Sequence, residues 1–248
     1  MDKTNISLEV CVDSVAGAVA AQDGGAVRVE LCDNLIEGGT TPSAGTIALA
    51  RRHIDIGLNV IIRPQGGDFC YSDVEFEVMR YDVEEAKRLG TDGVVIGVLT
   101  PDGDIDVDRV RALIDVARPL SVTFHRAFDV CRDPFAALET LIDLGVDRVL
   151  TSGQEPTTLE GADLIAELVR RAGDRIIIMA GGGINERNVD KIIAQTGVKE
   201  IHVSARSSVD SAMTYRNTRV FMGGELRPPE YSRKTTDAAR VRFFAGIR

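Results

Sequence analysis

The sequence repeats one short pattern of chemically useful residues, in which a glutamate and a cysteine are separated by one apolar residue. The pattern occupies residues 9–11 and 30–32, each time inside an apolar run. Side chains alternate between the two faces of a β-strand, so the glutamate and the cysteine of each pattern share one face. A polar face cannot pack against an apolar helix layer. Both Glu-x-Cys faces should therefore point into the interior of a barrel, side by side.

The two carboxylates, Glu9 and Glu30, permit two interpretations. A buried ion without a partner is costly, and the available cations or donors are Arg28, Arg63, His125 and His202. Glu9, Glu30 and Arg63 could form a structural ion network that holds the strands in register. Alternatively, one carboxylate has a raised pKa, and the pair performs acid–base catalysis beside Arg63 and His125. Arg63 and His125 qualify because each lies at the end of a later apolar run. The sequence leaves both interpretations open.

The two thiols, Cys11 and Cys32, also permit two interpretations. Neighbouring strands lie about 4.8 Å apart, and two thiolates at that separation are suitable ligands for soft Cu(I). Buried cysteines equally serve as small apolar residues that only pack. Copper binding and inert packing are therefore both open.

A second group of residues could bind an anion. Gly181, Gly182 and Gly183 follow one apolar run and precede a helix, while Ser204 ends the next run and Arg206 comes shortly after it. The loops after strands seven and eight commonly bind phosphate in barrel enzymes, because their backbone N–H groups can approach it. A tight turn from strand to helix needs glycine in any case. An anion-binding site at these five residues is one expectation, and a simple turn is the other.

The lysines limit the chemistry that an enzyme of this sequence could perform. None of them falls at the carboxyl end of an apolar run; they are Lys3, Lys87, Lys191, Lys199 and Lys234. Schiff-base chemistry is therefore not expected, and neither is a nucleotide or pyridoxal phosphate cofactor. If the protein is an enzyme, the residues favour a lyase or isomerase that uses acid–base catalysis on a small anionic or phosphorylated substrate.

The elements that position these residues follow one rhythm, in which short runs rich in β-branched residues alternate with amphipathic stretches. The runs occupy Ser7–Val12, Val27–Leu31, Asn59–Ile62, Gly93–Val98, Leu120–His125, Arg148–Thr151, Arg175–Ala180 and Glu200–Ser204. Eight such units in 248 residues predict a single α/β domain over 1–248, a (β/α)8 TIM barrel. Ser72 and Glu75 form a capping box that begins one of the helices.

One segment, at about residues 209–236, breaks the rhythm and is expected to be irregular. It carries several large apolar side chains: Met213, Tyr215, Val220, Phe221 and Met222. Exposed apolar groups in a long segment indicate an interface or a lid. We expect a homodimer with this segment in or beside the contact, and a lid over the site is the competing interpretation.

Composition restricts the partners and the compartment. The net charge of −9 at pH 7 argues against nucleic acid and acidic membrane surfaces, but an arginine cluster could still bind a small anionic ligand. No apolar run is long enough for a signal peptide or a membrane span. Four cysteines without a CxxC spacing indicate reduced thiols in the cytoplasm.

The motifs together resemble the CutC copper homeostasis protein family over nearly the whole chain. The segments that carry the resemblance are 8–14, 30–32, 37–43, 62–69, 123–129, 150–153, 181–184 and 204–206. The resemblance implies a barrel in the cytoplasm and a role in copper tolerance or trafficking. It also implies that Cys11 and Cys32 match the cysteines suggested as Cu(I) ligands in that family.

Overall fold

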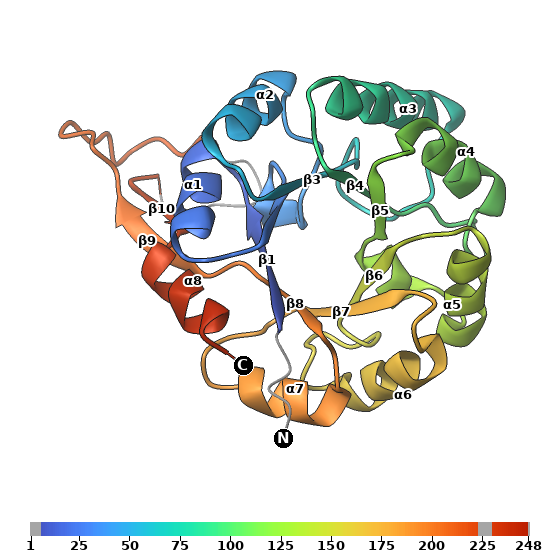
Figure 1. Ribbon diagram of the computed structural model, residues 1–248. Coiled ribbons are helices and arrows are strands. Elements are labelled where there is room, and N and C mark those ends of the chain that lie inside the picture. Colours follow the sequence, from blue (N-terminus) through green and yellow to red (C-terminus); the bar gives the residue numbers. More distant parts are fainter. Residues whose placement is uncertain (1–5, 223–229, 248) are drawn as a thin grey trace.

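The computed structural model describes residues 6–222 and 230–247, and its centre is a closed barrel of eight parallel strands surrounded by helices (Figure 1). The strands of the barrel are β1 (Ser7–Val12), β2 (Arg28–Leu31), β3 (Gly57–Ile61), β4 (Gly93–Ile96), β5 (Ser121–Phe124), β6 (Arg148–Thr151), β7 (Ile177–Gly181) and β8 (Glu200–Val203). Strand β1 pairs with both β2 and β8, which closes the barrel. The predicted (β/α)8 barrel is confirmed.

The helices cover the outside of the barrel. They are α1 (Val15–Asp23), α2 (Ala44–His53), α3 (Asp73–Arg88), α4 (Val107–Ala117), α5 (Pro134–Asp143), α6 (Ala162–Ala172), α7 (Val189–Thr196) and α8 (Ala238–Ala245), with two 3-10 turns at η1 (Leu35–Glu37) and η2 (Arg126–Val130). The capping box predicted at Ser72 and Glu75 begins α3. Among the described residues, no helix is both long and apolar enough to cross a bilayer.

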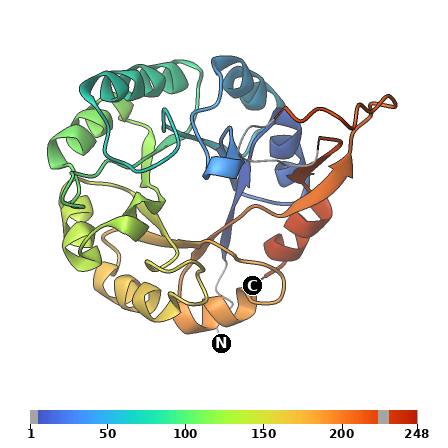
Figure 2. The same cartoon turned by 180° about the vertical axis from the view of Figure 1, so that it is seen from behind.

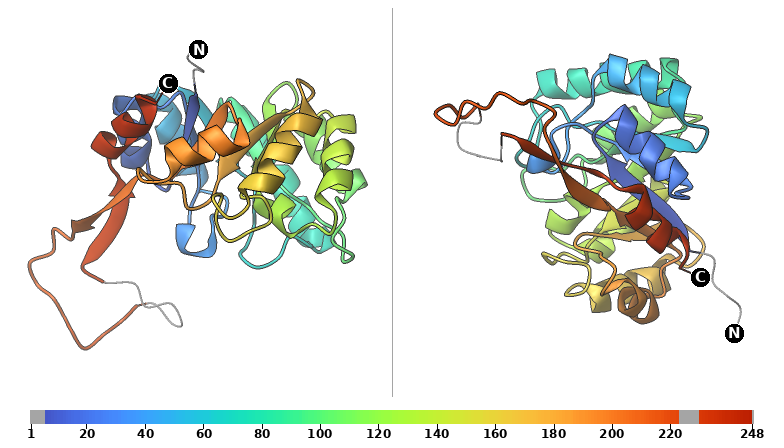
Figure 3. Two further views of the ribbon diagram at one scale, coloured as in Figure 1. Left: turned by 90° about the horizontal axis from the view of Figure 1, so that it is seen from below. Right: turned by 90° about the vertical axis from the view of Figure 1, so that its left-hand side faces the viewer.

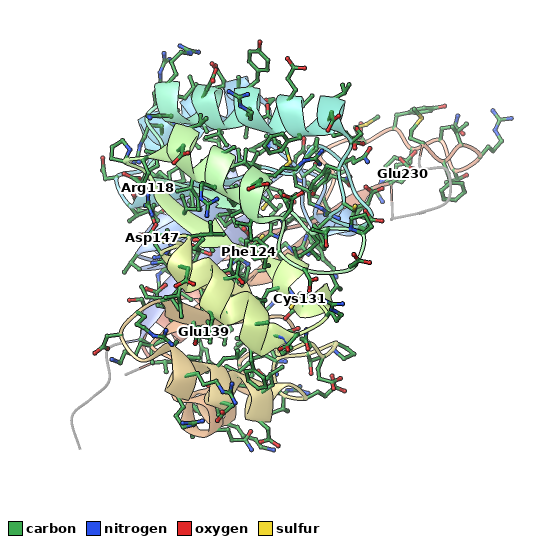
Figure 4. All side chains as sticks on the ribbon, turned by 90° about the vertical axis from the view of Figure 1, so that its right-hand side faces the viewer. Arg118, Phe124, Cys131, Glu139, Asp147 and Glu230 are labelled. Carbon is green, nitrogen blue, oxygen red and sulfur yellow. The ribbon has the colours of Figure 1, made fainter. Side chains whose placement is uncertain are left out.

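An aspartate directly before a strand joins successive β/α units at the amino end of the barrel. Before β6, Asp147 accepts hydrogen bonds from the backbone N–H of Val122 on β5 and from Arg118 just after α4, both at 2.8 Å. Figure 4 shows Arg118 and Asp147 at this end. Before β4, Asp92 does the same for Leu58 of β3 at 2.8 Å. These bonds tie the beginnings of β3 and β5 to the residue that precedes the next strand.

The register and the strand alternation order the polar side chains along the lumen. From the amino to the carboxyl end they are Arg28, Arg148 and Glu200, then Glu9, then Glu30 and His202, then Cys11 and His125, then Cys32, and finally Arg63. The opposite faces of β1 and β2 belong to the large apolar core beneath the helices. Both Glu-x-Cys faces therefore point inward, as the alternation predicts.

A two-stranded hairpin interrupts the rhythm between β8 and α8. It consists of β9 (Arg206–Asp210) and β10 (Ser232–Thr236), which pair antiparallel. We call residues 206–222 and 230–236 the arm. The arm lies outside the ring of helices and extends past the loops that follow the strands (Figures 2 and 3). The segment expected to be irregular therefore forms a pair of strands at its two ends. The sequence did not indicate these strands, because they have no apolar face. Residues 223–229 lie outside the part of the chain that the structure describes.

Candidate functional site

The floor of the site is a buried network of ion pairs. Arg28 bridges two strands: its Nε donates to Glu9, and its Nη2 donates to Glu200 Oε2 at 2.7 Å. Arg148, on β6, donates from Nε to the same Glu200 oxygen at 2.6 Å. Two carboxylates and two guanidinium groups therefore compensate one another at the amino end of the lumen.

His202, on β8, connects this floor to the next layer. Its Nδ1 lies 2.8 Å from Glu9 Oε1, and its Nε2 lies 3.6 Å from Glu30 Oε2. Burial alone would lower the pKa of His202, but its hydrogen bonds with Cys11 and Glu9 raise the pKa well above the ordinary value. His202 is thus a protonated imidazolium at neutral pH, held between the two glutamates.

The two glutamates have opposite pKa shifts. Burial would raise the pKa of Glu9, but the hydrogen bond from His202 and the charge of Arg28 hold it at about 2. For Glu30 burial is the dominant effect and raises the pKa to about 8, against the charge of His202. At neutral pH one carboxyl is ionised and the other is protonated. The pair therefore provides a base and an acid a few ångströms apart.

The two thiols of the predicted copper site are in contact. Cys11 Sγ and Cys32 Sγ are 3.7 Å apart, and Cys32 Sγ is 3.5 Å from Glu30 Oε2. The hydrogen bond between the thiols lowers the pKa of Cys11 and raises that of Cys32; burial opposes the first shift and adds to the second. One thiolate and one thiol therefore lie side by side. In the described part of the chain, Cys11, Glu30 and Cys32 form a buried group whose potential ligand atoms lie within 4.8 Å of one another.

A cavity of about 300 Å³ connects this group to the carboxyl end of the barrel. We call it the mouth cavity. Its lining includes Cys11, Glu30, Arg63, His125, Arg126 and His202. Burial and the charge of Arg63 lower the pKa of His125 to about 3, so this histidine is neutral. The cavity thus combines the reactive thiol, the protonated glutamate and the neutral histidine.

The structural ion network of Glu9, Glu30 and Arg63 suggested from the sequence is wrong for Arg63. Glu9 pairs with Arg28 and His202, whereas Arg63 donates to the backbone carbonyls of Glu37 and Gly39, both at 2.8 Å. The reason is the height of Arg63 in the barrel, since it stands at the carboxyl end of β3 and Glu9 lies near the floor. Glu30, Arg63 and His125 share the mouth cavity, and their catalytic use remains a prediction.

The sequence indicates His202 only as one of the available cations or donors, although it is the group that lies between both glutamates. The alternation on β8 does place His202 on the inward face, which was the available signal. The sequence interpretation missed Arg126, which follows His125 and donates to Asp129 and Ser152 at 2.7 Å each. A residue in a 3-10 turn such as η2 has no strand alternation to mark it.

The residues expected to bind an anion occupy two places. Gly182 and Gly183 have φ values of 122° and 74°, so this turn needs glycine whether or not an anion binds. Ser204 is exposed just after β8. Arg206 lines a separate groove with Asp13 and Asp33. An anion site that combines Gly181, Gly182 and Gly183 with Ser204 and Arg206 remains a prediction.

The fold and the site define a class of protein: a (β/α)8 barrel with a thiol pair, two glutamates of opposite protonation and an arginine–histidine cavity at the carboxyl ends of its strands. Comparison with known proteins narrows the class. The family model of the CutC family matches residues 6–207, and the chain belongs to this family.

The relatives cover nearly the whole chain. A mouse protein named copper homeostasis protein cutC homolog is 53% identical over 240 residues, which are 97% of this chain and 88% of the mouse protein. A CutC family protein of Parabacteroides distasonis is 55% identical over 238 residues, which are 96% of this chain and 98% of that protein.

Solved structures agree with the fold. The crystal structure of a copper homeostasis protein CutC from Streptococcus agalactiae aligns with a TM-score of 0.77 at 37% identity, covering 80% of this chain and 98% of that one. An aldolase named QR15 aligns with a TM-score of 0.58 at 18% identity, covering 82% of this chain and 90% of that one, which shows the barrel alone.

Proposed function

We propose that the protein is a copper homeostasis protein that binds Cu(I) through Cys11 and Cys32 in the barrel lumen. The observation that carries the proposal is the pair of sulfur atoms 3.7 Å apart, one of which lines the mouth cavity. Soft thiolates select Cu(I) over the hard divalent cations that prefer carboxylates and water. The names of the relatives, which refer to copper homeostasis, support the same function.

The surroundings of the thiols fit a captured cation. Cys11 has a lowered pKa and is ready to bind, while the Cys32 proton would be released when the metal arrives. Apolar side chains, Ile61 and Val95, pack around the two sulfur atoms. Such a shell keeps water away from the bound ion and strengthens its interaction with the thiolates. The mouth cavity is the route by which the ion would enter.

An anaerobic titration with Cu(I) against a coloured Cu(I) chelator tests the proposal. We expect one tightly bound ion per chain, lost in the double variant Cys11→Ser plus Cys32→Ser. The matched control is Cys70→Ser plus Cys131→Ser, which removes the other two thiols and should leave binding unchanged. Undiminished binding in the first variant would reject the site.

We also propose a cytoplasmic location and a homodimer. All four cysteines are free, which suits a reducing compartment. The arm extends away from its own barrel and exposes Met213, Tyr215 and Met222, which a second copy could cover (Figure 3).

A further inference from the structure

The mouth cavity contains a buried positive charge that copper binding does not use. Arg63 is 5% exposed and donates to three backbone carbonyls, those of Glu37, Gly39 and Gly67. Carbonyls satisfy N–H donors, but they do not neutralise a guanidinium. Within residues 6–222 and 230–247, Arg63 forms no ion pair with a carboxylate, and its buried Nε has no hydrogen-bond partner. A buried cation without a counter-ion is unfavourable unless a ligand supplies one.

A second polar group in the same cavity also lacks a partner. His125 is 4% exposed, and its Nδ1 accepts a hydrogen bond from the backbone N–H of Ala127 at 3.1 Å. Because Nδ1 accepts, the neutral ring must carry its proton on Nε2, where it is a donor. Nε2 is buried and unpartnered among the described residues. Gly97 lies against the Nδ1 and Cε1 atoms of the ring, and His125 is one of the residues that line the mouth cavity.

Phe69 holds these two groups next to each other. Its ring lies 5.1 Å from Arg63 Cζ and 5.0 Å from the centre of the His125 imidazole. The cavity volume of about 300 Å³ suits a molecule of metabolite size. A fixed cation, a neutral N–H donor and an aromatic wall are the parts from which small oxyanion sites are built.

We propose that the mouth cavity is a binding site for a small oxyanion, with Arg63 providing the charge and His125 Nε2–H a directed hydrogen bond. Carboxylates and phosphates share this chemistry. Neither donor is a thiol, and Arg63 stands nearer the carboxyl end of the barrel than Cys11, so binding does not require the thiol pair or copper. The site differs from the predicted one at Gly181–Gly183, because its donors come from β3 and from the end of β5.

Histidine NMR on the full chain tests the proposal, because the sequence has only three histidines. The chain would be labelled with ¹⁵N-histidine and titrated separately with malonate and inorganic phosphate. We expect a saturable shift of His125 Nε2–H for at least one probe, with Nδ1 remaining unprotonated. The affinities for malonate and for phosphate then show whether the site prefers a carboxylate or a phosphate. Exposed His53 is the internal control and should not shift.

Variants make the test specific. His125→Phe keeps a ring beside Phe69 and removes the donor, and Arg63→Met removes the charge. Each should weaken binding of the probe, measured by isothermal titration calorimetry, about tenfold or more. Arg109→Met is the matched control, because Arg109 also lies 5.1 Å over a phenylalanine ring but pairs with aspartates. The variant Cys11→Ser plus Cys32→Ser should bind the probe as the wild type does.

Three results would overturn the site. They are an absence of any His125 shift with both probes, affinities that survive Arg63→Met and His125→Phe, and loss of anion binding when only the thiols are replaced. If Arg63→Met fails to fold, the wild-type titration and His125→Phe still decide the question.

Discussion

In the lumen, the two glutamates differ from each other in protonation, and so do the two cysteines. Glu9 is ionised and Glu30 is protonated, while Cys11 has a lowered pKa and Cys32 a raised one. His202 is central to both differences, because it lies beside Glu9 and Glu30 and its charge lowers the pKa of Cys11. The behaviour of the site thus depends on one imidazolium.

Replacing His202 should therefore destabilise the protein. His202→Asn removes the hydrogen bond to Glu9, although Arg28 still pairs with that carboxylate. We expect the free energy of unfolding in urea to fall by about 1–3 kcal/mol, the usual effect of losing a buried bond to a charged group. The exposed His53 gives the control variant His53→Asn. A loss no larger than that of the control would mean that His202 is not the organising group.

His125 should make stability depend on pH. Burial and the charge of Arg63 lower its pKa to about 3, whereas in the unfolded chain it titrates near 6.5. Above about pH 6.5 His125 is neutral in both states, so it adds no pH dependence to the free energy of unfolding. As the pH falls toward about 3, the unfolded state takes up a proton that the folded state does not, so stability falls by up to about 1.4 kcal/mol per pH unit. Urea unfolding of wild type and His125→Phe across this window should differ in slope, and equal slopes would refute the shift.

At the scale of elements, the ion network on the lumen floor joins β1, β2, β6 and β8. Arg148→Met would leave Glu200 with Arg28 alone and should lower the free energy of unfolding by about 3 kcal/mol. Arg175→Met breaks an exposed pair with Glu139 and should lower it by less than about 1 kcal/mol. Chemical denaturation measures both, and similar small losses would show that the floor does not hold the strands together.

The strands were predictable because their signal is local. Alternation on β1 and β2 is enough to direct Glu9, Cys11, Glu30 and Cys32 inward, and it needs no tertiary information. The sequence indicates Arg28 and His202 among the available partners, but it does not indicate which cation pairs with Glu9. That choice depends on height along the barrel: Glu9 pairs with Arg28 and His202, and Arg63 stands too far toward the carboxyl end. The β9–β10 pair was missed for a similar reason, since its exposed strands carry no apolar face.

At the scale of the molecule, the arm is the part that the barrel does not cover. Met213 is 59% exposed and Met222 is 83% exposed. We expect a dimer mass by light scattering, and dissociation without unfolding in the variant Met213→Asp plus Met222→Asp. Val74→Asp, at an exposed apolar residue of α3, is the control. A monomeric wild type would reject the dimer, and an unchanged mass with altered ligand binding would favour a lid.

The central claim, that Cys11 and Cys32 together hold Cu(I), is tested most directly by X-ray absorption at the copper K-edge of the protein loaded with one ion per chain. We expect a first shell that contains two sulfur atoms, reduced to one in Cys11→Ser or Cys32→Ser. A shell made of nitrogen and oxygen, or a sulfur shell that persists when both cysteines are replaced, would contradict it.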